Sequence, residues 1–114
     1  MSYTAIQLKK LAKENPQELV KIINNSEKDI VILTFGAEII GEELEDELIV
    51  LPIFRRLLKH IHALVRESAM IGVSSFYFGK KLPEEVRKRL EDISKTDPSP
   101  VLKEYAKDLL GDFS

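Results

Sequence analysis

The chain has 114 residues, of which 44% are hydrophobic and 32% are charged, and its net charge is −2. This length suits one domain, and the composition excludes a disordered or fibrous chain. A net charge so close to zero gives no general attraction to nucleic acid or to an anionic membrane. The absence of cysteine excludes disulfides, thiolate nucleophiles and Cys-ligated zinc, and it is compatible with a reducing compartment.

The N-terminal segment predicts a short amphipathic helix over residues 4–13. Thr4 and Gln7 have the spacing of a capping box, in which each side chain accepts a hydrogen bond from the backbone of the other. Lysines interrupt the apolar residues of this segment, so it is not a signal peptide. No apolar run in the chain reaches the ~20 residues that span a bilayer. We therefore expect a cytoplasmic protein without a membrane segment.

Two further helices are predicted before residue 42. Asn15 and Pro16 suit the N-cap and the first position of a second helix, which ends near residue 25. Asp29 suits the N-cap of a third helix. A strand over 30–35 is the alternative, but the following residues have helical spacing. The expected buried stripe of the third helix is Ile32, Phe35, Gly36, Ile39 and Ile40.

The fourth predicted helix runs from about Asp46 to Lys59 and contains Pro52, which predicts a kink or a late helix start. Its expected buried face is Leu48, Leu51, Phe54, Leu57 and Leu58. A turn at 60–62 precedes a fifth helix that ends near Phe76. Its stripe consists mostly of small residues, which let neighbouring helices approach closely: Val65, Ser68, Ala69, Gly72, Val73 and Phe76.

Two helices are predicted in the last third of the chain. Gly79 suits a left-handed terminator of the fifth helix, and Pro83 suits the first position of the sixth. The expected buried stripe of the sixth helix is Val86, Leu90 and Ile93. After a loop, Ser99 and Pro100 predict the N-cap and first position of the seventh helix. Its expected inward residues are Leu102, Tyr105, Ala106, Leu109 and Leu110, and Gly111 is expected to end it.

The chain contains an internal repeat. Residues 65–69 and 102–106 share one pattern 37 positions apart, and residues 32–36 occupy the same register 33 positions before the first of them. Self-similarity at such a period indicates one helical hairpin that is built three times and stacked. Asp29, His62 and Ser99 occupy equivalent positions before these helices. Because histidine is the weakest N-cap of the three, we expect the second turn to be the least well capped.

Residues 63–69 resemble the second helix of a HEAT repeat, and residues 51–59 resemble its first helix, including the frequent proline. Residues 97–104 are similar to the turn and second-helix start of another unit. The resemblance covers 45–111 well and 16–41 more weakly. It implies an all-α fold, a right-handed α-α superhelix of about three HEAT-like hairpins in a single domain. Residues 1–15 would form a capping helix, and 16–43, 44–78 and 79–114 the repeat units.

The family resemblance also implies a function. HEAT-type proteins are scaffolds and adaptors that hold a partner protein on the concave face lined by second helices. The family's ladder of Asp and Arg is matched here only by Asp29 and Arg66. We expect a non-catalytic protein-interaction module without a cofactor, in which Met70 provides an adaptable apolar contact. The expected partner-binding residues are Glu38, Arg66, Glu67, Met70, Ser74, Lys103 and Lys107.

Other readings stay open at this stage. Six acids between residues 38 and 47 form either a solvated turn or a surface that covers a basic cleft, as an immunity-type inhibitor of a toxin would. A HEAT-like nucleic-acid-binding or DNA-processing module is the alternative, although acids interrupt the basic clusters at 55–66 and 80–89. His60 and His62 lack a third metal ligand, and no catalytic motif is present. Self-association through residues 76–78 leaves the oligomeric state undefined.

Overall fold

The structure, a computed structural model, describes residues 3–114, and these contain seven α-helices and no strand. The predicted all-α class is confirmed, and the alternative strand over 30–35 is excluded because a helix covers it. The chain divides into two compact units, Met1–Phe76 and Tyr77–Ser114. Among the described residues, no helix is both long enough and apolar enough to cross a bilayer.

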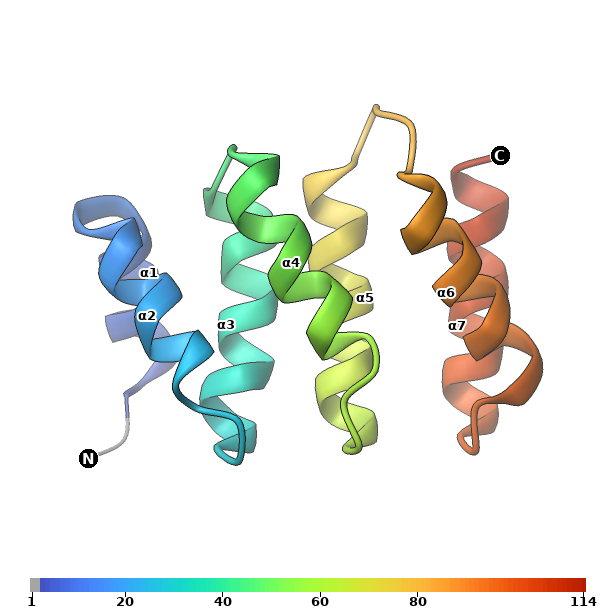
Figure 1. Ribbon diagram of the computed structural model, residues 1–114, viewed down its shortest axis with the longest axis horizontal. Helices are drawn as coiled ribbons and strands as arrows, with labels where there is room; N and C mark the ends of the chain where they lie inside the picture. Colours follow the sequence, from blue (N-terminus) through green and yellow to red (C-terminus); the bar gives the residue numbers. More distant parts are fainter. Residues whose placement is uncertain (1–2) are drawn as a thin grey trace. The chain divides into compact units, whose positions relative to one another are not determined.

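The first unit contains five helices: α1 (Ala5–Glu14), α2 (Pro16–Asn24), α3 (Ile30–Glu43), α4 (Glu47–Leu57) and α5 (Ala63–Phe76). Helices α3 and α5 lie side by side and run in the same direction, while α4 crosses both (Figure 1). Helix α1 packs against α2 and α3. The pair of α3 and α5 therefore forms the centre of this unit.

Most helices in the chain begin at the predicted capping residues. The Thr4 hydroxyl accepts from the backbone N–H of Gln7 (3.1 Å), and the Gln7 side chain accepts from the backbone N–H of Thr4 (2.8 Å). Side-chain oxygens of Asn15, Asp29 and Ser99 cap α2, α3 and α7 in the predicted positions. These N-termini are set by local hydrogen bonds, which is why the sequence predicts them well.

The α3 and α5 backbones touch at two glycines. A Cβ atom on Gly41 would lie 2.6 Å from the Cα of Gly72 and would also overlap its carbonyl group. A Cβ atom on Gly72 would meet the carbonyl of Ala37 and would lie 2.8 Å from the ring of Phe54. The predicted stripe of small residues on 63–76 is thus confirmed, and its physical role is to let two helix backbones meet.

Two predicted buried faces are wrong in part. Leu48 is 87% exposed and Leu51 is half-buried, because α4 turns its other side to the core. The buried face of α4 repeats at i, i+3, i+4 and i+7 through Val50, Ile53, Phe54 and Leu57. The helix continues past Pro52. On α3, Phe35 is 42% exposed, since the core-facing surface is formed by other residues, among them Leu33, Ala37 and Ile40.

The second unit contains α6 (Glu84–Thr96) and α7 (Pro100–Asp112), which form an antiparallel pair (Figure 1). The structure confirms the buried stripe of α6, whereas Tyr105 and Leu110 of α7 are only half-buried. Two predicted ends shift by one residue, because Pro83 is the N-cap of α6 and α7 continues to Asp112. Gly79 has the predicted positive φ, at 76°. The predicted repeat unit 79–114 lies wholly within this part.

Candidate functional site

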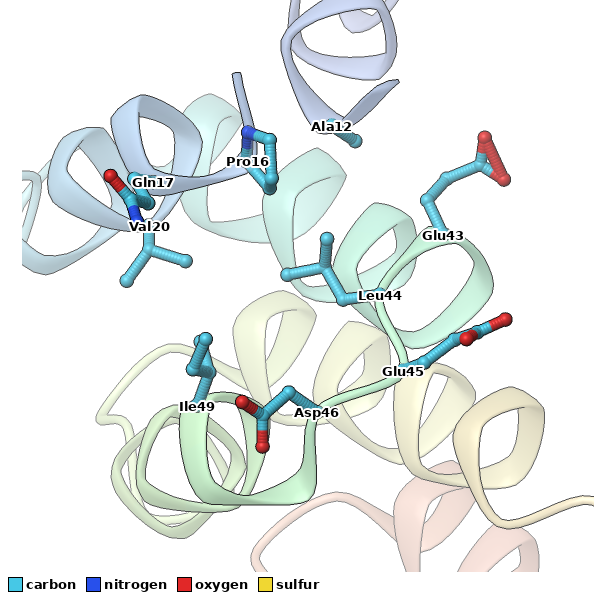
Figure 2. Close-up of a pocket in the computed structure, with 9 residues that line it drawn as sticks. All are labelled: Ala12, Pro16, Gln17, Val20, Glu43, Leu44, Glu45, Asp46 and Ile49. Carbon is cyan, nitrogen blue, oxygen red and sulfur yellow. The ribbon is translucent and has the colours of Figure 1, made fainter. Parts of the chain in front are cut away.

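A pocket of about 530 Å³ opens in the first unit, among the end of α1, the start of α2, the end of α3 and the start of α4 (Figure 2). Its volume lies within the range of roughly 300–1000 Å³ that is typical of ligand sites. The lining residues come from two chain corners and are Ala12, Pro16, Gln17, Val20, Glu43, Leu44, Glu45, Asp46 and Ile49.

Two short connections create this pocket. Asn15 ends α1 and caps α2 at the same time, so the chain reverses around one residue and presents Pro16 at the corner. The connection between α3 and α4 has only three residues, because Leu44 ends α3 and Asp46 caps α4. Asp46 Oδ1 accepts a hydrogen bond from the backbone N–H of Leu48 at 3.0 Å. The two corners face each other across the pocket (Figure 2).

The interior of the pocket is apolar. The side chains of Val20 and Ile49 point toward one another, and Leu44 extends toward Pro16 (Figure 2). Ile49 is 40% exposed, and Val20 and Leu44 are half-buried. Three helices thus present apolar side chains to a shared space that none of the described residues of the first unit fills. Such an arrangement favours an apolar guest.

The edge of the pocket is acidic. Glu43, Glu45 and Asp46 supply three carboxylates, and those of Glu43 and Glu45 extend away from the interior on one side (Figure 2). Lys13 approaches this edge, with its Nζ 3.8 Å from Glu43 Oε1. The residues that line the pocket include these three carboxylates and no Lys or Arg, so its edge has a local excess of negative charge. Unlike charges would be attracted to it.

The residues predicted to bind a partner are divided between the two units. Glu38, Arg66, Glu67, Met70 and Ser74 lie on α3 and α5, and Lys103 and Lys107 lie on α7. The half-buried Glu38 accepts a hydrogen bond from the hydroxyl of Ser68 at 3.1 Å. Glu67, Ser74 and Lys103 are half-buried, and Lys107 is exposed with its Nζ 3.4 Å from Glu104 Oε1.

Two of these residues, both on α5, are buried. Met70 is 0% exposed and Arg66 is 8% exposed. The reason is that α5 is buried over more than one face, whereas the prediction assumed a single apolar stripe. Arg66 Nη1 donates to the carbonyl oxygens of His60 and Ile61, each at 2.9 Å. Its guanidinium therefore holds the turn between α4 and α5 by hydrogen bonds to the turn's own backbone.

The same turn contains both histidines. The His62 ring accepts at Nδ1 from the backbone N–H of Leu64 (3.1 Å), so it caps α5. The His60 ring accepts at Nδ1 from the backbone N–H of His62 (3.0 Å), and its Nε2 lies 3.0 Å from the carbonyl oxygen of Glu27. The turn expected to be poorly capped is thus held by two imidazoles and Arg66. Within residues 3–114, no group of three His, Cys, Asp or Glu could hold a metal ion.

The sequence reasoning missed the apolar pocket residues and a second exposed apolar surface. Leu44 gave a usable signal, because it is an apolar residue inside the acidic run 42–47. On α3 and α5, Phe35 and Leu64 are 42% and 54% exposed. Phe35 lies one helical turn before Glu38, and Leu64 one turn before Ser68. Because the side chains of Glu38 and Ser68 are hydrogen-bonded to each other between α3 and α5, Phe35 and Leu64 lie on the same side of the two helices as that bond. Helix α3 therefore exposes an aromatic side chain next to its contact with α5.

The comparisons with known proteins identify no relative. The sequence matches no protein-family model, and neither curated proteins nor solved structures contain a significant match.

Proposed function

We propose that the chain is a non-catalytic protein-interaction module that binds a partner protein in the pocket between α1, α2, α3 and α4. The observation that carries this proposal is an open apolar pocket of about 530 Å³ with an acidic edge. We also propose a HEAT-like arrangement, with three hairpins, a capping helix and a right-handed superhelix. It is supported by the parallel α3 and α5 and by the crossing α4 (Figure 1). A cytoplasmic location stays a prediction that rests on the composition.

The pocket supports docking better than chemistry. The residues that line it include no His, Ser, Thr, Lys or Arg, and their polar groups are three carboxyls and the amide of Gln17. Glu45 and Asp46 are exposed, whereas a carboxyl that works as a general acid needs an apolar surrounding. We therefore place the binding site at this pocket, and not at the inner-helix residues Arg66 and Met70, which are buried.

A more specific form of this proposal is an immunity-type inhibitor that blocks a toxin. Its support is the position of the acidic run: Glu43, Glu45 and Asp46 border an apolar pocket, so one surface offers both anchoring and negative charge. This surface has the chemistry needed to cover a basic cleft. Nothing observed favours the HEAT-like nucleic-acid-binding alternative, because carboxylates border the pocket and would repel phosphate groups.

The test compares two variants that carry the same substitution, one inside the pocket and one on the neighbouring surface. Ile49→Arg places a long cationic side chain at the pocket, and Leu48→Arg makes the same change one residue earlier, at an 87% exposed side chain outside the lining. Peptides are selected from a random displayed library on the unmodified chain and then measured on both variants. We expect Ile49→Arg to abolish binding and Leu48→Arg to retain it, with unchanged helical circular dichroism for both.

Two outcomes would reject the proposed function. One is the absence of any enriched peptide on the unmodified chain. The other is a set of peptides that bind Ile49→Arg as well as Leu48→Arg, since these would dock elsewhere on the molecule.

A further inference from the structure

We infer that the occupant of the pocket is a segment of a partner protein in which a large apolar side chain is flanked by lysine or arginine. This inference rests on the proposed function and names the chemistry of the partner. It joins two features of one site, the apolar interior formed by Val20, Leu44 and Ile49 and the carboxylates at its edge (Figure 2).

The size and apolar lining of the pocket determine which side chain of the partner can be buried in it. Its volume of about 530 Å³ falls in the range of sites that bury drug-sized molecules, so it has room for a large side chain. The apolar surface comes from three helices, so a guest with a long or aromatic side chain contacts all three at once. Buried apolar area at the centre of an interface is where most of the binding free energy arises.

The edge sets the flanking charges. Glu43 already has Lys13 at 3.8 Å, so the exposed Glu45 and Asp46 are the carboxylates that a partner's cations would approach. Asp46 uses Oδ1 to cap α4, and a carboxylate has several acceptor positions over its two oxygens. Arg or Lys on both sides of the apolar anchor would therefore lie against this edge, where Asp or Glu would be repelled.

The wall of the pocket is held in place before any partner arrives. Leu44 follows Gly41 by three residues, and the backbone of Gly41 is in contact with that of Gly72 on α5. A helix fixed in this way cannot shift without separating the two central helices of the unit. A preformed site loses little conformational entropy on binding, so even a short peptide is a suitable probe.

The experiment uses four synthetic peptides of equal length. They carry a central leucine between lysines, the same leucine between glutamates, the same leucine between serines, and a central serine between lysines. Fluorescence anisotropy measures their affinity for the unmodified chain. We expect the peptide with leucine between lysines to bind most tightly, and its affinity to fall as the salt concentration rises.

Variants of the edge identify where the charge acts. Glu45→Gln with Asp46→Asn removes two charges, and Asn preserves the N-cap of α4. The matched control, Glu14→Gln with Glu42→Gln, removes two exposed charges of the same unit that do not line the pocket. We expect the edge variant to weaken the lysine-flanked leucine peptide by roughly tenfold, with a change below roughly twofold for the control.

The outcomes separate the inference from the proposed function. Equal binding of the lysine-flanked and serine-flanked leucine peptides, abolished by Ile49→Arg, would overturn the inference and leave the pocket as a docking site. Equal binding of the two lysine peptides would also overturn it, because no apolar anchor would then be needed. Failure of every peptide to bind, or binding that Ile49→Arg does not change, would overturn both.

Discussion

Gly41 and Leu44, near the end of α3, lie three residues apart in opposite environments. At Gly41 the helix backbone contacts Gly72 of α5, and there is no space for even one additional carbon atom. At Leu44 the same helix borders an open pocket of about 530 Å³ (Figure 2). The end of α3 thus combines a close backbone contact with an open pocket.

The difference shows how this small unit combines stability with an accessible apolar surface. The contact between α3 and α5 depends on side chains that are absent, because glycine lets two backbones approach. The pocket depends on apolar side chains that no residue between 3 and 76 covers. Substitutions on the two sides should therefore have opposite effects: large losses of stability at the contact, and losses of binding with little change in stability at the pocket.

The largest effect is expected at the backbone contact. Gly41→Val places three carbon atoms where the backbone of Gly72 lies, and neither backbone can move away cheaply. We expect the free energy of unfolding to fall by at least about 3 kcal/mol in urea denaturation. The control is Gly111→Ala, since a Cβ there meets nothing within 4 Å; it should change stability by less than about 1 kcal/mol. Similar losses for both variants would show that the contact is looser than described.

An intermediate effect is expected at the other end of α5. Arg66→Ala removes a buried guanidinium that donates to the carbonyls of His60 and Ile61. We expect a loss of about 2 kcal/mol, measured by urea denaturation, because hydrogen bonds to charged groups are among the stronger ones. Arg56→Ala is the comparison: this exposed residue donates to Asn24 and to the carbonyl of Ile23. Arg56→Ala should lower the free energy of unfolding by less than about 1 kcal/mol. A loss as large as that of Arg66→Ala, or larger, would contradict the role assigned to Arg66.

The smallest effect on stability is expected at the pocket. Ile49→Thr removes apolar surface from a side chain that is already 40% exposed and keeps a β-branched residue in α4. We expect thermal denaturation to show a loss below about 1 kcal/mol, while peptides selected on the unmodified chain bind more weakly. A loss as large as that of Arg66→Ala would mean that the residue supports the core of the unit and not a binding surface.

The parts of the fold that the sequence predicted are those decided by neighbouring residues. Thr4, Asn15, Asp29 and Ser99 cap helices through bonds to residues three positions ahead, so their spacing was sufficient. The buried face of α4 was not predictable in this way. Its leucines, isoleucines and valine are similar in hydrophobicity, and the contacts with α3 and α5 select which of them are buried.

The site was harder to predict than the fold, for a related reason. The pocket joins Val20 and Ile49, which are 29 positions apart and meet only because two corners face each other. The family resemblance pointed to the inner helices, and there Arg66 is occupied by a turn that depends on His60 and Ile61. The acidic run was the one part of the site that the sequence indicated, and the sequence did not show that an apolar pocket lies beside it.

Asn15 is the single residue between α1 and α2, since it ends the first helix and caps the second. The connection at this corner therefore has no additional residue that could absorb a change in length. Lengthening it by even one amino acid would displace Pro16 from its place opposite Leu44, so the width of the pocket is fixed by a count of residues as much as by their chemistry.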